Sequence, residues 1–326
     1  MTRVFITIDT EYSSGLYSGP GADDRRENFA CSIAGITPDG PAGITHKLDL
    51  LRETGQRAVF FVDPMPALVW GIAAIEDVVG PILVAGQEVQ LHCHTEWLGL
   101  AGDANPLASR ATGRNLFDFT FEDQCAIIDY ARSTLMAAGA PAPIAFRAGN
   151  YGANDDTLRA LAANGIAYDS SHCPALAGSG VCRIALSPEV RDPVGHMGVI
   201  EVPIGAIGTL GGGLRHAQIT ALTLAEMLAA IRHVRAAGRS DLVLVSHSFE
   251  LLNRRTRSIN HIVRRRFAGL LAALARMREV ETGSFAATPP LLRLTGETPA
   301  ALPASAIRTG RRMAEQLVSN ALYGAI

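Results

Sequence analysis

Short runs of apolar residues alternate along the chain with longer segments in which apolar positions recur at helical spacing. The apolar runs are Val4–Ile8, Ala58–Val62, Val89–Leu91, Ile144–Phe146, Ile166–Tyr168, Val199–Pro203 and Leu242–Val245. Helical spacing is found over Ile44–Arg52, Glu122–Ala137, Asp155–Ala163, Leu222–Ala236 and His261–Arg276. This alternation predicts an α/β fold in which helices cover the outer side of a parallel sheet or barrel.

The last part of the chain has a different pattern. Four prolines between residues 289 and 303 interrupt it before a final helical pattern over Ser305–Tyr323. We therefore expect one barrel domain over residues 1–288, followed by a proline-containing linker and an appended helix over residues 289–326. The helix carries three arginines, which we interpret as a solvated face. Packing on the barrel and formation of a homo-oligomer through this helix are both open.

Composition narrows the class of protein. The 326 residues are 48% hydrophobic, and 29 basic against 31 acidic side chains give a net charge of -2, so we expect no nucleic-acid partner held by phosphate contacts. No uncharged stretch approaches the ~20 residues that a transmembrane helix needs. The first residues lack the pattern of a secretory signal, and the five cysteines form no CxxC pair. We expect a cytoplasmic protein without a disulfide framework.

Polar side chains follow several of the apolar runs. They are Asp9, His92, Arg147, Asp169 and His247. In a parallel α/β barrel the carboxyl ends of the strands share one face, where the active site is built. We therefore expect these five side chains, although they are far apart in sequence, to converge on one site.

The segment around His92 is the strongest local signal. If the strand continues through it, His92 and His94 point to the same side, because side chains in a strand repeat every two residues. Asp9 and Glu11 stand at matching alternate positions near the N-terminus. Two imidazoles with a carboxylate suit a divalent metal, with zinc as the expected ion, and Glu96 is an alternative ligand.

These motifs together resemble the NodB-like polysaccharide deacetylases. The matching segments, in order, are Thr7–Glu11 (TIDTE), Gly86–His94 (GQEVQLHCH), Phe146–Gly152 (FRAGNYG), Tyr168–Ser171 (YDSS) and Leu244–His247 (LVSH). The resemblance implies an irregular (β/α) barrel, often with seven strands. It also implies metal-dependent removal of N- or O-acetyl groups from sugars.

Carried over by position, the resemblance assigns a role to each motif residue. Asp9 matches the catalytic base, Arg147 the arginine that orients this base, and His247 the general acid, with Asp169 near it. His92 matches the first metal histidine.

The chain departs from the family pattern at the metal site. Thr10 stands where the family has a second aspartate, and the next histidine follows His92 after two residues instead of four. The preferred metal ligands are Asp9 or Glu11 with His92 and His94. Glu96 is kept in reserve.

We expect a hydrolase that removes an acetyl group from an N-acetylated sugar, with a carbohydrate or nucleotide sugar as substrate. Trp97, Asn150 and Tyr151, beside the metal and arginine motifs, are the candidate substrate-binding residues. The alternatives are a related barrel hydrolase for non-sugar C–N bonds, with or without a metal, and a catalytically inactive carbohydrate-binding barrel. Retention of both Asp9 and His247 weighs against the last of these.

Overall fold

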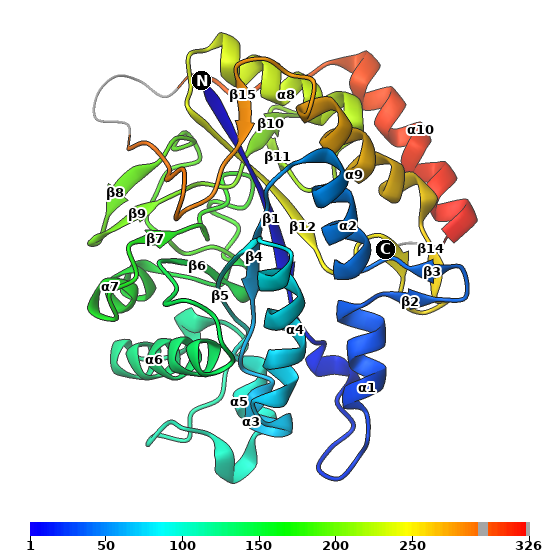
Figure 1. Ribbon diagram of the computed structural model, residues 1–326. Coiled ribbons are helices and arrows are strands. Elements are labelled where there is room, and N and C mark those ends of the chain that lie inside the picture. Colours follow the sequence, from blue (N-terminus) through cyan, green and yellow to red (C-terminus); the bar gives the residue numbers. More distant parts are fainter. Residues whose placement is uncertain (293–298, 324–326) are drawn as a thin grey trace.

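A curled sheet of parallel strands forms the centre of the molecule (Figure 1). The computed structural model describes residues 1–292 and 299–323. Seven strands run parallel in the order β12-β1-β4-β5-β6-β7-β9. Their bounds are β1 (Thr2–Thr10), β4 (Val59–Val62), β5 (Glu88–Cys93), β6 (Ala145–Ala148), β7 (Tyr168–Asp169), β9 (Val199–Glu201) and β12 (Asp241–His247). Each corresponds to one of the seven apolar runs of the sequence.

Two further strands complete the nine-stranded sheet in the described part of the chain. β8 (Val194–His196) is antiparallel to β9, and β15 (Val280–Thr282) is parallel to the beginning of β1. The remaining strands form three small hairpins: β2 (Ile36–Thr37) with β3 (Gly40–Pro41), β10 (Ala206–Gly208) with β11 (Leu214–His216), and β13 (Leu252–Asn253) with β14 (Ser258–Ile259).

The two ends of the parallel path approach each other just beyond β9. Ile204 forms an isolated parallel bridge to Val243 of β12, and the Gly205 N–H donates to the Val243 carbonyl at 3.0 Å. A Cβ at residue 205 would lie 2.6 Å from that carbonyl oxygen, so only glycine permits this approach. The sheet therefore curls into the irregular (β/α) barrel that the sequence predicts.

Helices cover the outer side of the sheet and join its strands (Figure 1). The α-helices are α1 (Arg25–Asn28), α2 (Ile44–Thr54), α3 (Ala67–Trp70), α4 (Ala73–Val84), α5 (Glu96–Leu100), α6 (Phe121–Ala137), α7 (Asp155–Ala163), α8 (Leu224–Ala236), α9 (His261–Leu274) and α10 (Ala306–Tyr323). The short helices are η1 (Ser14–Leu16), η2 (Phe29–Ile33), η3 (Gly102–Ala104), η4 (Leu116–Asp118) and η5 (Gly149–Tyr151). Side-chain caps fix the start of α6, α7, α8 and α9: Thr120, Asn154, Thr223 and Asn260 each accept a backbone N–H of the first turn.

Side chains of the parallel strands alternate between two environments. In β1 the even positions Val4, Ile6 and Ile8 belong to the large core between sheet and helices. The odd position Phe5 belongs to a smaller core inside the barrel, where Phe285 packs against it with ring centroids 5.4 Å apart. The barrel is thus filled by apolar side chains at the amino end of the strands.

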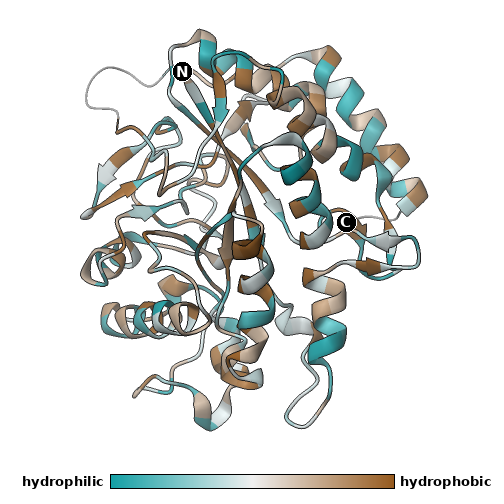
Figure 2. Ribbon diagram, viewed as in Figure 1, coloured by the Kyte–Doolittle hydropathy of each residue, from teal (hydrophilic) through white to brown (hydrophobic). Residues whose placement is uncertain are grey.

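α10 lies against the barrel with its polar side facing inward. Arg312 pairs with Glu226 of α8, Glu315 pairs with Arg266 of α9, and the buried Ser319 accepts from the Asn260 side chain. Its outward residues include Ile307 and Leu317, which are 85% and 70% exposed, and Figure 2 shows the apolar stretches along this helix.

Within residues 1–292 and 299–323 no helix combines the length and apolarity that crossing a bilayer requires. The division of the chain at residue 288 stays a prediction.

Candidate metal and catalytic site

The site is at the carboxyl ends of the parallel strands, on the lower side of the molecule in Figure 1. Asp9 is paired in register with His247 on β12, and His92 on β5 is paired with Arg147 on β6. Glu11 follows β1 two residues after Asp9, and His94 follows β5 two residues after His92. The alternation of side chains in a strand directs all of them to the barrel interior.

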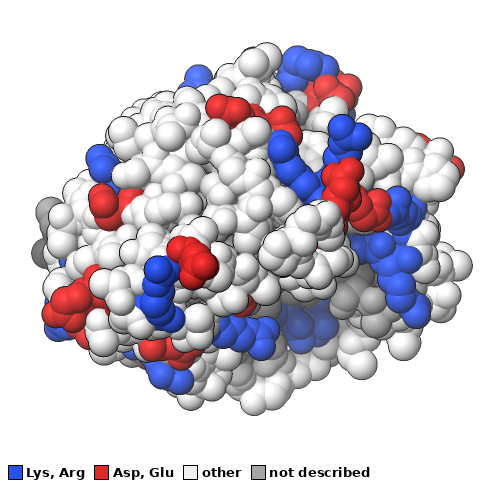
Figure 3. Space-filling model, turned by 90° about the horizontal axis from the view of Figure 1, so that it is seen from below, with Lys and Arg blue, Asp and Glu red and all other residues white. Residues whose placement is uncertain are grey.

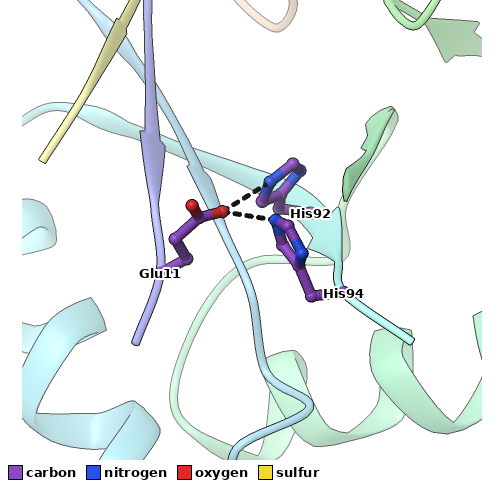
Figure 4. Close-up of side chains that lie close together, drawn as sticks. All are labelled: Glu11, His92 and His94. Carbon is purple, nitrogen blue, oxygen red and sulfur yellow. Dashed lines mark hydrogen bonds and ion pairs between the residues drawn. The ribbon is translucent and has the colours of Figure 1, made fainter. Parts of the chain in front are cut away.

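Glu11, His92 and His94 form a compact group of potential metal ligands (Figure 4). One Glu11 oxygen, Oε2, lies 3.0 Å from His92 Nε2 and 2.6 Å from His94 Nε2. One ligand atom from each residue lies within 4.8 Å of the other two. Two imidazoles and one carboxylate are the donor set of several catalytic zinc sites, which leave a position open for water or substrate.

The hydrogen bonds around this group fit a metal. His92 Nδ1 lies 2.7 Å from the Arg147 carbonyl oxygen, which can only accept, so Nδ1 carries a proton and Nε2, on the side of Glu11, is the nitrogen that a metal would bind. His94 Nδ1 faces Glu96 Oε2 at 3.2 Å in the same way. Glu96 therefore contacts the ring nitrogen of His94 that is not directed at Glu11. A carboxylate in this position orients metal-bound histidines in many sites.

The charges of this group are strongly coupled. Burial disfavours both charged forms, but mutual attraction outweighs it: His94 and His92 lower the pKa of Glu11, and Glu11 raises the pKa of His94. A proton therefore stays on His94 when no cation takes its place. A divalent cation would supply the same positive charge at this position.

Asp63 is a carboxylate at this site that the sequence analysis did not single out. It directly follows β4, it is buried, and its Oδ1 accepts the backbone N–H groups of Met65 and His94 at 3.1 and 3.3 Å. Its Oδ2 is buried without a hydrogen-bond partner among the described residues. Burial raises the pKa of Asp63 to about 6, although His94 and His92 oppose the shift. The position of Asp63 directly after an apolar run was the feature of the sequence that could have identified it as a site residue.

Arg147 holds Asp9 in place. Its Nη1 donates to Asp9 Oδ1 at 2.6 Å and to Thr7 Oγ1 at 2.8 Å, and its Nε donates to the Ser170 carbonyl. The guanidinium group also lies 4.4 Å from the centre of the Phe61 ring. Arg147 is fully buried and Asp9 is 3% exposed, so the pair is shielded from water. The sequence expectation that these two residues meet agrees with this geometry.

His247 faces Asp9 from the neighbouring strand. Its Nε2 lies 3.8 Å from Asp9 Oδ2, and its Nδ1 lies 2.9 Å from Glu250 Oε1. Burial lowers the pKa of His247, but the carboxylates of Glu250 and Asp9 outweigh this and raise it to about 9. His247 is therefore protonated at neutral pH, as a general acid must be.

Glu250 and Lys47 extend this arrangement and were missed from the sequence. Burial raises the pKa of Glu250, but His247 outweighs it and brings the value to about 2. Lys47 Nζ donates to Ser246 Oγ and to the His247 carbonyl, both at 2.6 Å, and burial lowers its pKa to about 8. Two features of the sequence could have identified these residues. Glu250 follows His247 after three positions, and Lys47 lies on the apolar face of helix α2.

Asp169 lies at the end of β7, beside Ser171 and Glu201. Its hydrogen bonds go to the backbone N–H and hydroxyl of Ser171, and it interacts with Glu201 on β9. Burial raises the pKa of both carboxyls, and Asp169 raises that of Glu201 further, so a proton is retained between them. Among the described residues, the polar side chains that contact the His247 ring are Glu250, Gln218 and Asp9, and a place for Asp169 near His247 stays a prediction.

The three candidate substrate residues have different surroundings. Trp97 is fully buried and packs against Trp70 at 5.2 Å between ring centroids. Asn150 is exposed and donates to Glu96 Oε1 at 3.0 Å. Tyr151 is half-buried, and both it and Asn150 have φ of 56°, a conformation that non-glycine residues rarely adopt outside functional sites. Asn150 is thus open to a ligand, whereas Trp97 belongs to the core.

Comparisons with known proteins find similarity at the level of structure. No family model and no curated protein sequence matches the chain. A protein of Mycobacterium smegmatis assigned to the polysaccharide deacetylases superposes with a TM-score of 0.57 at 16% identity, covering 90% of this chain and 94% of the other.

Two enzymes of α-glucan metabolism also superpose. The α-amylase AmyC of Thermotoga maritima gives a TM-score of 0.52 at 10% identity, over 97% of this chain and 80% of the enzyme. The 4-α-glucanotransferase of Thermococcus litoralis gives 0.53 at 10% identity, over 87% of this chain and 39% of the enzyme. Because proteins of one fold can have different activities, these similarities establish the fold and not the reaction. They confirm that the chain has the barrel fold found in polysaccharide deacetylases.

Proposed function

We propose that the protein is a metal-dependent deacetylase that hydrolyses the amide of an N-acetylated sugar. The observation that carries this proposal is the meeting of three groups at one face of the barrel. They are the Glu11–His92–His94 cluster, the Asp9–Arg147 pair and the protonated His247. Amide hydrolysis needs a base, a proton donor for the leaving amine and a stabilised oxyanion. Asp9 and His247 supply the first two, and a divalent ion held by the cluster would supply the third.

The residues divide the chemistry as follows. A divalent ion held by Glu11, His92 and His94 would polarise the carbonyl group and lower the pKa of a bound water from ~16 toward ~7. Asp9 accepts the proton of the attacking water on Oδ2, the oxygen that Arg147 leaves free. His247 donates its Nε2 proton to the nitrogen of the sugar amine as the C–N bond breaks. Acetate and the free amine leave.

Metal dependence gives the direct test of the proposal. The purified protein is expected to bind about one zinc-like ion per chain and to release acetate from N-acetylated oligosaccharides or nucleotide sugars. Removal of the ion should abolish release, and its return should restore it. His92→Ala is expected to lose the ion, because it removes one of three ligands.

Elemental analysis and an acetate assay measure these outcomes. His233→Ala is the matched control, since His233 lies on α8 and its ring hydrogen-bonds to the Ala300 carbonyl, away from the strand ends that carry the site. Full metal content in His92→Ala would remove His92 from the site. Acetate release that persists without metal would favour a metal-free hydrolase, and no release from any sugar would favour an inactive carbohydrate-binding barrel.

A second prediction concerns Glu250. The acid form of His247 is lost as pH rises through about 9, so the activity of the wild type is expected to fall there. Glu250→Gln removes the largest of the interactions that raise this pKa, and the alkaline limb of the kcat profile should move toward lower pH. Measurement of kcat from pH 6 to 10 checks this. The exposed Glu53→Gln is the control and should keep the wild-type profile.

The same shifts set the direction of pH-dependent stability. The pKa of His247 is raised in the folded protein, so His247 makes its full contribution to folding stability below the ordinary value of 6.5. This contribution is lost as pH rises through about 9. The pKa of Glu250 is lowered in the folded protein, so Glu250 contributes to stability above its ordinary value of 4.5. This contribution to stability is lost as pH falls toward about 2.

The kinetic test of Glu250 has a clear contrary outcome. An unchanged alkaline limb of the kcat profile in Glu250→Gln would show that Glu250 does not set the pKa of His247.

The identity of the sugar, the cytoplasmic location and a homo-oligomer through α10 stay predictions. We propose a sugar unit of a surface-polysaccharide precursor as the substrate. The exposed apolar residues of α10 support the oligomer.

A further inference from the structure

The loop that follows β12 places an arginine beside His247. The His247 ring lies 5.3 Å from the Phe249 ring, measured between centroids and at 36° between planes. The guanidinium carbon of Arg254 lies 4.1 Å from the centre of the Phe249 ring. Arg254 is therefore at most 9.4 Å from the His247 ring, which is the sum of the two separations. A sugar bound at His247 brings its substituents to this distance.

The backbone beside Arg254 is held in a defined conformation. Asn253 Oδ1 accepts the N–H groups of Arg255 and Thr256 at 2.9 and 3.1 Å, and its amide donates to the Tyr323 carbonyl. These bonds fix the β13–β14 turn. The guanidinium group is thereby positioned by its own turn as well as by the Phe249 ring.

Arg254 is the member of this turn that is available for a ligand. Its side chain is exposed, and within residues 1–292 and 299–323 no carboxylate pairs with it. The nearby Arg257 pairs with Glu27 instead. A guanidinium group stacked on an aromatic ring keeps its N–H edge free, and this planar edge matches the two oxygens of a carboxylate or phosphate.

We propose that Arg254 binds an anionic group, a carboxylate or a phosphate, carried by the sugar on the side of the leaving amine. The inference rests on the proposed function, in which His247 marks that side because it protonates the amine. Figure 3 shows Lys and Arg interspersed with Asp and Glu on one face of the molecule, so the argument for an anionic group is the guanidinium of Arg254, unpaired among the described residues, and not a basic surface. The substrate class is thus an N-acetylated sugar with a carboxylate or a phosphoester.

Direct binding tests the inference without any turnover. The full chain is titrated by calorimetry with inorganic pyrophosphate and, separately, with glucuronate, so that the two sources of negative charge are distinguished. Arg254→Met keeps the unbranched stem on Phe249 and removes the charge. We expect it to weaken binding of the preferred anion about 10- to 100-fold, the range typical of hydrogen bonds to charged groups. Arg254→Lys should restore part of the affinity, and the control Arg255→Met should bind as the wild type does.

A kinetic arm separates this inference from the proposed function. Matched N-acetylated sugars with and without the anionic group are compared by kcat/KM, and Arg254→Met is expected to lose the preference for the charged one. Anion binding that depends on Arg254, without acetate release from any sugar, would overturn the deacetylase assignment and keep the anion site. The inference would be overturned if the wild type and Arg254→Met bound the anion with equal affinity. It would also be overturned if a lowered melting temperature were the sole effect of Arg254→Met, because Arg254 would then only pack on Phe249.

Discussion

Asp9→Asn is expected to lower the rate of acetate release by about 100- to 10,000-fold, the range for a positioned general base. Asparagine has the shape of aspartate and can still accept the Arg147 hydrogen bond on its oxygen. It cannot take a proton from water at neutral pH. The change should therefore appear in kcat while the metal content stays at the wild-type level, because Asp9 is outside the Glu11–His92–His94 cluster.

Single-turnover assays and elemental analysis measure the two effects separately. Asp49→Asn on the exposed side of α2 is the control, and it should leave both quantities unchanged. A loss of less than tenfold in Asp9→Asn would end the assignment of Asp9 as base. A loss of metal would instead make Asp9 a ligand, which the sequence analysis considered as an alternative to Glu11.

Arg147→Met is expected to lower the free energy of unfolding by about 3–5 kcal/mol, the range found when one partner of a buried ion pair is removed. Methionine fills part of the space, but it leaves Asp9, which is 3% exposed, without its cation. It also leaves Thr7 Oγ1 and the Ser170 carbonyl without their donor. Urea denaturation followed by circular dichroism gives the free energy.

Two further variants make the stability measurement specific. Arg52→Met breaks an exposed pair with Asp49, in which the side chains are 73% and 45% exposed, and should cost less than about 1 kcal/mol. The double variant Arg147→Met with Asp9→Asn should recover part of the loss, since it removes the uncompensated charge. A cost for Arg147→Met as small as that for Arg52→Met would mean that the buried pair contributes little to folding.

The barrel strands could be predicted because each contains or directly follows a short run rich in apolar residues, as β1 contains Val4–Ile8. Helix α4 could not be predicted, because Gly80 and Pro81 lie in its interior and interrupt the helical pattern of the sequence. Pro81 is tolerated there because the rest of the helix packs through Ile75, Val78 and Val79 on the sheet. Tertiary packing thus outweighed the local preference.

The site was predictable where a functional side chain lies at the carboxyl end of a strand. Asp9, His92, Arg147 and His247 follow this rule, and the structure brings them to one face. Lys47 lies on a helix, and Glu250 lies in a loop three residues after His247. Their contacts with the site depend on how α2 and that loop pack on β12, which no local pattern encodes. Asp169 lies at the end of a strand as well, yet its carboxyl group interacts with Glu201 and Ser171.

The inverted orientation of α10 has a consequence for how firmly the chain end is attached. Leu317 and Leu322 are 70% and 65% exposed, so lifting the helix away brings little additional hydrocarbon into contact with water. Ion pairs such as Glu315 with Arg266 hold the helix instead. Arg266 and Glu226, the barrel-side partners of these pairs, are 4% and 3% exposed, so dissolved salt screens them less than it would screen charges on the surface. The specific position of α10 on the barrel is therefore set by the geometry of its charged contacts, and not by the area of hydrocarbon that it covers.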